Sequence, residues 1–285
     1  MGGLDRFLTV IDRKKGRPFL ELFASSLNED YRFPVMEVFC FLYAIGAFIF
    51  AGFSSSLFGF GTSEDSVAYF LTSSLLGFPL FIFVILNLKN VAFGLGNDLE
   101  KGIVQTFFSY PIKRRWILSA KLLSAVGVGL IPFVGILTSG LYVLAPDVVG
   151  PHLGIVLLTF ATSLSEPLLV TGIVLLVTLL LKRGALALVL GIVTYFALAI
   201  LQQIVSVIAA FTNNVAGLQV LSLISPNLIA SRYFSTQSAG PFFFGQTSSW
   251  TPTFGDVLAY TAGSYAIVII IFLLGYLYFS RRLNL

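Results

Sequence analysis

The sequence has little charge, one cysteine and one histidine in 285 residues. Charged residues make up 11% of the chain, against roughly 25% in soluble domains. With Cys40 as the single cysteine, an internal disulfide and a cysteine metal cluster are excluded, and with His152 as the single histidine there is no H-E-x-x-H zinc motif. No G-x-x-x-x-G-K-[ST] sequence occurs. We therefore expect no catalytic residue, and no cofactor or metal bound by this chain.

Long apolar runs take the place of the missing charge. Hydrophobic residues make up 57% of the chain, and the mean hydropathy is +0.94. A helix needs about 20 apolar residues to cross roughly 30 Å of hydrocarbon, and uniform runs favour helices over the alternating strands of a barrel. The predicted fold is an all-α polytopic membrane protein with six transmembrane helices, at Val35–Phe58, Val67–Leu88, Trp116–Leu144, Gly154–Leu181, Ala185–Ala209 and Val257–Phe279.

Lysine and arginine alternate between the two sides of these spans. The N-terminal segment, residues 89–115, the Lys182-Arg183 turn and the C-terminal tail hold nearly all of them. Residues 59–66 and 145–152 hold none, and residues 211–256 hold only Arg232. Because basic residues stay on the cytosolic side, both termini are predicted to be cytosolic in a multi-pass protein of the plasma or inner membrane. The net charge of +4 comes from these loops and does not indicate nucleic-acid binding.

The N-terminal segment is predicted to be an amphipathic helix. Leu4, Phe7, Leu8 and Ile11 lie on one helical face among mixed charges, and the segment is too long and too acidic for a signal peptide. Such a helix before the first span is typical of the cytosolic membrane interface, with lipids as its partner. The alternative is a solvated helix that packs on a soluble partner. The predicted domains are residues 1–33, interfacial, and residues 34–285, one transmembrane domain.

Residues 97–121, between spans two and three, form a distinctive pattern. Asp98 and Glu100 are expected at the start of a short helix, where acidic groups favour the helix dipole, and Pro111 is expected to end it. An apolar ridge on this helix would face the cytosol and dock on a partner, since exposed apolar patches mark interaction sites. The alternative is a helix that only lies on the membrane. The expected ridge consists of Ile103, Val104, Phe107 and Phe108.

With these residues the sequence resembles the permease subunit of type-2 ATP-binding-cassette (ABC) exporters. The family shares an acidic residue, a glycine, an apolar-threonine helix, a proline followed by a basic residue, and a lysine in the next span. Here those places are held by Glu100, Gly102, Thr106, Pro111, Arg114 and Lys121. The Phe107-Phe108 pair departs from the commoner leucine pair. Six spans, an amphipathic entry helix and the Phe279-Ser-Arg-Arg-Leu ending extend the resemblance along the chain.

The resemblance implies a coupling helix that seats on a separate ATPase subunit. Two ATPase subunits would bind ATP and Mg²⁺, and a second permease copy or a similar subunit would complete the pathway as a dimer. The exported substrate is expected to be hydrophobic or amphipathic, such as a drug, a lipid-like molecule or a peptide, because the spans offer few charges. The implied coupling residues are Asp98, Glu100, Gly102, Ile103, Thr106, Phe107, Pro111 and Arg114.

Polar residues within the spans suggest a second site. Glu166 lies roughly 24 Å above Lys182 at 1.5 Å per residue, and Gln202 and Gln203 reach a similar height on the next span. Together, with Thr162 or Ser165, they are candidates for a gating or pathway layer; the alternative is an interhelical hydrogen-bond cluster. An ion-coupled secondary transporter that uses Glu166 is the competing function, although no internal repeat is found.

Two smaller features complete the expectations. Lys89 and Asn90, at the inner end of span two, are predicted to be surface anchors. In residues 211–256 the apolar stretch Leu218–Ile224 is too short to span and is broken by Ser225-Pro226-Asn227. The family resemblance implies short re-entrant outer helices there, and the aromatic residues nearby suit either a lid or an interfacial belt.

Overall fold

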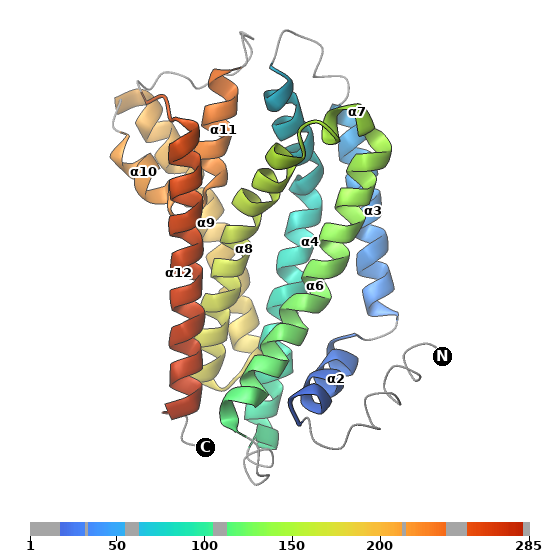
Figure 1. Ribbon diagram of the computed structural model, residues 1–285. Coiled ribbons are helices and arrows are strands. Elements are labelled where there is room, and N and C mark those ends of the chain that lie inside the picture. The colour runs from blue at the N-terminus through green and yellow to red at the C-terminus, as the bar shows by residue number, and fades with distance from the viewer. Residues whose placement is uncertain are drawn as a thin grey trace.

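The protein is a bundle of long helices, closed at one end by short ones (Figure 1). The structure, a computed structural model, describes residues 18–31, 34–54, 63–104, 113–212, 215–237 and 250–281. Within these residues there are helices and no strands. The helices are α2 Pro18–Asp30, α3 Val35–Ser54, α4 Glu64–Glu100, α6 Arg114–Leu144, α7 Pro146–Val149, α8 Leu153–Leu181, α9 Gly184–Thr212, α10 Ala216–Ser222, α11 Asn227–Thr236 and α12 Phe254–Arg281.

Five of these helices, α4, α6, α8, α9 and α12, are long and apolar enough to cross a membrane. Counting the bent pair formed by α2 and α3 as one span would bring the number to at most six. The two members of that pair meet at 67°. The all-helical, polytopic membrane character predicted from the sequence is therefore confirmed.

Helix α4 is the longest and lies in the centre of the bundle. It packs against α3, α6, α8 and α9, and its 37 residues make it about 55 Å long at 1.5 Å per residue. The helix continues for about three turns beyond Leu88, the predicted end of the span, because the apolar stripe continues at helical spacing. That stripe packs into the core through Val91, Ala92, Leu95 and Leu99.

The apolar core has two main parts. The inner part joins the second half of α4 to α6, α8, α9 and α12. The outer part joins α3 to the first half of α4 and to α6, α7 and α8, around Phe133, which meets the Tyr43 ring edge to face and the Phe83 ring at a tilt. Among the five long apolar helices, α4 and α8 have the largest share of buried residues, and α9 and α12 have the smallest. Exposed apolar side chains on α9 and α12 fit a hydrocarbon solvent.

The short helices lie at the end of the bundle where α12 begins. Helices α10 and α11 follow α9 there (Figure 1), and α11 packs on α4, α8 and α12. Two short helices with a break at residues 223–226 confirm the predicted pattern of a segment too short to span. Two aromatic residues of α11 pack on other helices and on each other. Phe234 stacks on Tyr69 of α4, and Tyr233 contacts Phe254 of α12.

The opposite end of the bundle carries the basic residues. Helix α4 ends there, α6 and α9 begin there, and α8 and α12 end there (Figure 1). Arg232, on α11, is the exception among the described residues and lies at the other end. The lysines and arginines at or toward the basic end are Lys89, Lys101, Lys113, Arg114, Arg115, Lys121, Lys182, Arg183 and Arg281.

At the basic end, α4 and α9 touch through their backbones. Helix α8 stops at Lys182, which takes a left-handed conformation with φ 55°, and α9 starts two residues later at Gly184. A Cβ on Gly96 would lie 2.5 Å from the Gly184 Cα, and a Cβ on Gly184 would lie 2.6 Å from the Ala92 carbonyl oxygen. Only glycine fits at both positions, since real Cβ contacts are longer.

Candidate functional site

The predicted coupling segment begins at the end of α4. Asp98 and Glu100 were expected to start a helix, but α4 runs through both and ends at Glu100. The chain then turns at Lys101, whose amide donates to the Asn97 carbonyl, and at Gly102, which has φ 70°. A glycine in this conformation after a helix is the usual stop signal, because other residues are strained there.

Beyond the turn, the two described residues of the predicted apolar ridge differ in exposure. Ile103 is exposed, as expected of a docking residue, whereas Val104 is fully buried in the inner core and cannot face a partner. Arg114 begins α6 on the far side of the segment. Thr106, Phe107 and Pro111 lie outside the described residues.

Lys121 joins three helices at this end of the bundle. From α6 its ammonium group contacts the Asp98 carboxylate on α4, the Glu29 carboxylate on α2 at 3.3 Å, and the Gly94 carbonyl oxygen at 3.3 Å. The side chains of Lys121 and Asp98 are 12% and 8% exposed, and that of Glu29 is 39% exposed. We call Lys121, Asp98, Glu29 and the Gly94 carbonyl the inner junction.

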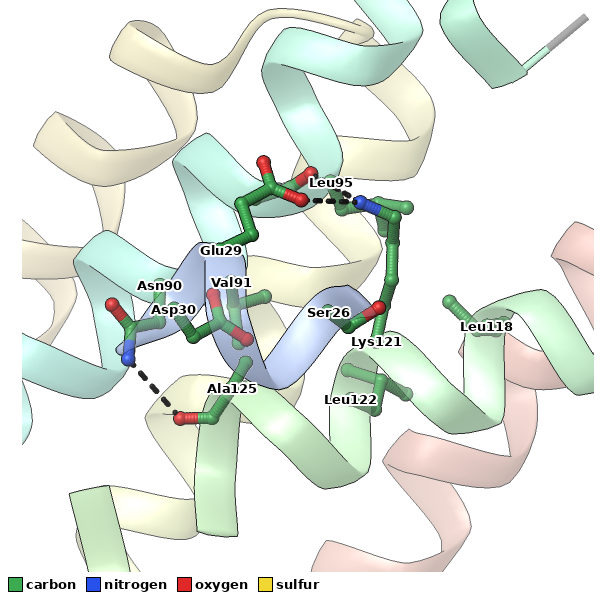
Figure 2. A pocket seen from close by; sticks show the side chains of 11 residues that line it. Ser26, Glu29, Asp30, Asn90, Val91, Leu95, Leu118, Lys121, Leu122 and Ala125 are labelled. Atoms are coloured by element: carbon green, nitrogen blue, oxygen red, sulfur yellow. Dashed lines mark hydrogen bonds and ion pairs between the residues drawn. The ribbon is translucent and has the colours of Figure 1, made fainter. Parts of the chain in front are cut away.

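Two further hydrogen bonds lie beside the inner junction. The Ser124 hydroxyl of α6 donates to the Asp30 carboxylate of α2 at 2.5 Å. The Asn90 amide of α4, which lies next to Asp30, donates to the Ala125 carbonyl oxygen at 3.3 Å (Figure 2). Asn90 is 3% exposed, so the prediction that it is a surface anchor was wrong. The last turn of α2 is thus tied by polar contacts to α6, and α6 to α4.

The carboxyl group of Asp30 is a weaker acid than an ordinary aspartate. Burial raises the pKa of this carboxyl to about 6, and the Glu29 carboxylate adds to the rise. The Ser124 hydrogen bond and the ammonium groups of Lys121 and Lys89 oppose the rise. A hollow of about 160 Å³ beside Asp30 is lined by Glu29, Asp30, Lys89, Asn90, Phe93, Gly94 and Asn97. Asp30 therefore changes charge close to neutral pH next to a space large enough for water.

The outer site predicted around Glu166 is present in part. The Gln202 amide of α9 donates to the Glu166 carboxylate of α8 at 2.9 Å, and the Ser225 side chain after α10 is a second hydrogen-bonding group at this carboxyl. Gln203 is exposed and does not belong to the pair. Thr162 and Ser165 are buried, but their hydroxyls donate to carbonyls of their own helix. The outer pair is therefore Glu166 and Gln202.

Between the two sites lies a buried amide with no partner. Asn87, one turn before Asn90 on α4, is fully buried, and neither amide atom has a hydrogen-bond partner. It faces Gly129 of α6, where a Cβ would lie 2.5 Å from the Asn87 Oδ1. Polar groups on α4 thus extend from the inner junction toward the middle of the bundle.

Sequence reasoning missed Glu29, Asp30 and Asn87. The first two were treated as part of an amphipathic segment, because the charge pattern of α2 does not show which helix it packs on. The signal for Asn87 was its helical spacing from Asn90, Gly94 and Asp98, which puts all four on one face of α4. Among the described residues, no group of three or more His, Cys, Asp or Glu is placed to hold a metal ion.

The inner junction can fix the relative positions of three helices, and the outer pair can tie two helices to the short outer helices. Both suit mechanical roles, because each joins polar side chains of different helices. No protein-family model, no curated protein and no solved structure showed a significant match to this chain.

Proposed function

We propose that the chain is the permease subunit of an ATP-driven ABC exporter of the second type. In this proposal α3, α4, α6, α8, α9 and α12 are the six membrane spans. The basic end of the bundle faces the cytosol, since basic residues are retained there, and both termini lie on that side. Helix α2 lies in the cytosolic interface, where its exposed residues Glu21, Ser25 and Asn28 form one polar face. Helices α10 and α11 are the short re-entrant helices of the outer side.

The observation that supports this proposal best is the position of the family motif in the fold. Glu100 and Gly102 end the longest helix at the basic end, and Lys121, the last residue of the motif, contacts Asp98 across the intervening segment. The two ends of the motif are therefore held together. A push from a docked partner on either end of this segment would then reach both α4 and α6.

The other components follow from what this chain does not carry. Two ATPase subunits would bind and hydrolyse ATP with Mg²⁺, and a second copy or a similar permease would complete the pathway. The export substrate would be hydrophobic or amphipathic, because the described span residues offer few charges to a polar solute. Alternating closure of the two ATPase subunits would then change access from one side to the other.

Purification of the native complex in mild detergent tests this assignment. We expect an ATPase subunit to co-elute in a 1:1 ratio with the chain. Ile103→Glu should abolish this association, because it puts a charge on an exposed apolar side chain of the coupling segment. Arg183→Gln, also exposed at the basic end but outside the motif, is the matched control and should retain it. Equal retention by both variants would count against the coupling assignment.

One observation favours a different function. Glu166 is an acidic group between two apolar helices, which is the arrangement of a proton-coupled secondary transporter. In that case transport would follow an imposed proton gradient without ATP, and Glu166→Gln would abolish it. Dependence on ATP hydrolysis by a co-eluting subunit excludes this alternative.

A further inference from the structure

The geometry of Lys121 suggests a role beyond packing. Its ammonium group has three N–H donors, and the structure provides three acceptors, one on α2 and two on α4. Because these acceptors lie on two helices while the lysine belongs to a third, the contact fixes three backbones at one point. A surface lysine would reach into water instead.

Stability alone does not account for the inner junction. Replacing a buried ion pair with apolar residues of similar size is often neutral or stabilising, because desolvation offsets the attraction. What charged contacts add over apolar packing is direction, since a Lys–Asp contact fixes the distance between two helices, whereas apolar side chains can slide. The hydrogen bonds from Ser124 to Asp30 and from Asn90 to the Ala125 carbonyl join the same helices close to this contact.

We propose that Lys121 is a positioning residue that makes the last turn of α2, the end of α4 and the inner part of α6 move as one body. A displacement applied to the segment after Asp98 would therefore reach α2, which otherwise packs mainly on α6 and only lightly on α4. The source of the displacement, a docked ATPase subunit, rests on the proposed function. The rigid connection itself does not.

Spin labels can measure the connection in the full-length protein in lipid nanodiscs, with Cys40→Ala removing the only native thiol. One label is placed at Glu21→Cys on the exposed face of α2, and the other at Lys101→Cys after α4. With the inner junction intact, we expect a narrow distance distribution. In the charge-free variant, which combines Glu29→Gln, Asp98→Asn and Lys121→Met, the width should increase about twofold, because the helices lose their directional contact.

A second pair of labels separates this effect from general loosening of the fold. Labels at Lys101→Cys and Arg183→Cys report on α4 and α9, which touch through Gly96 and Gly184 and do not depend on Lys121. This pair should keep its width in the charge-free variant. Broadening of both pairs, or of neither, overturns the proposal, because a positioning role predicts broadening of the first pair alone.

The ATPase-containing complex then tests the functional part. Trapping ADP with vanadate after ATP hydrolysis should shift both the Glu21 and Lys101 labels by the same amount relative to a label at Arg183→Cys. In the charge-free variant only the Lys101 label should follow. If no ATPase associates, the proposed function fails. The widths of the label-to-label distance distributions, measured without ATP, still test the positioning role on their own. Lys121→Arg, which keeps the charge, should retain more of the joint movement than Lys121→Met.

Discussion

The two ends of the bundle are held in different ways. At the inner end, charged groups from α2, α4 and α6 meet within a largely buried junction, and α4 touches α9 through two glycines. At the outer end, the uncharged side chains of Gln202 and Ser225 meet the Glu166 carboxylate, and the His152 ring nitrogens contact the exposed carboxylates of Glu64 and Asp65. The inner end is thus fixed by a buried ion pair and a backbone contact, while the outer end is held by uncharged hydrogen-bond partners and by one exposed contact that water can replace.

The largest effect should come from breaking the inner junction on one side only. Lys121→Met leaves the buried Asp98 carboxylate without its ammonium partner, so we expect a loss of about 3–5 kcal/mol of unfolding free energy, measured by unfolding in mixed micelles. The double variant Asp98→Asn with Lys121→Met should lose less, because no buried charge is left unpaired. If the two variants lose equal stability, the pair is not buried as described.

Adding a methyl group where α4 and α9 touch should cause the next largest loss of unfolding free energy. Gly96→Ala would put a Cβ against the Gly184 Cα and force α4 and α9 apart, at about 1–3 kcal/mol by comparison with overpacked cores. Gly127→Ala is the matched control, since nothing lies within 4 Å of a Cβ there. It should gain up to about 1 kcal/mol through helix propensity. Thermal unfolding of both variants in one detergent compares them directly.

Removing one polar partner at the outer end should lower the unfolding free energy by less than it does at the inner junction. Gln202→Leu removes the donor to Glu166, and we expect a loss of about 1–2 kcal/mol, because the carboxylate retains Ser225 as a second group. Gln203→Leu, one residue further on the exposed side of α9, is the control and should change stability by less than about 0.5 kcal/mol. A loss at Gln202 that exceeds that of Lys121→Met would reverse the comparison between the two ends.

Replacing Asn87, which lies between the two ends, should raise stability, whereas the replacements described above, apart from the controls, lower it. An amide buried without partners costs free energy that an apolar side chain of similar size does not, so Asn87→Leu should raise stability by about 1 kcal/mol. Asn90→Leu, which breaks a hydrogen bond, should instead lower it. A loss of stability in Asn87→Leu would show that the amide does bind a partner, such as a buried water molecule.

The stability of the folded state, in which α2 is docked, should also depend on pH through Asp30. The folded pKa of Asp30, about 6, lies above the ordinary 3.8, so the folded state binds more protons between these values and its stability falls as pH rises from about 4 to about 6. Asp30→Asn should remove this part of the pH dependence, although Glu29, Lys89 and Lys121 remain nearby. The melting temperature of the two proteins between pH 4.5 and 7.5 measures it. A parallel pH dependence in both would assign the effect to another group.

The sequence predicted the membrane fold well and the sites only in part. Long apolar runs identify spans reliably, because a run either is or is not long enough for the bilayer. The end of α4 was predicted twelve residues too early, since Lys89 and Asn90 interrupt hydropathy although the apolar stripe continues through Leu95 and Leu99. Glu166 and Gln202 could be paired from their heights on adjacent helices.

The inner junction could not be predicted in the same way. Glu29 and Lys121 are 92 residues apart, and their contact depends on the packing of α2 against α6, which apolar periodicity does not encode. The lysine itself was found through its place in a motif, but its partners were not. Contacts between distant segments need the packing of whole helices, which a pattern along one helix does not determine.

The paired glycines Gly96 and Gly184 have a mechanical consequence for α9. Side chains between two helices can absorb a small shift by changing rotamer, but two backbones in direct contact have no such slack. The glycine pair therefore acts as a fulcrum at the very start of α9, whose 29 residues form a lever about 44 Å long. A tilt of about 5° at that fulcrum would carry the far end of α9 by about 4 Å.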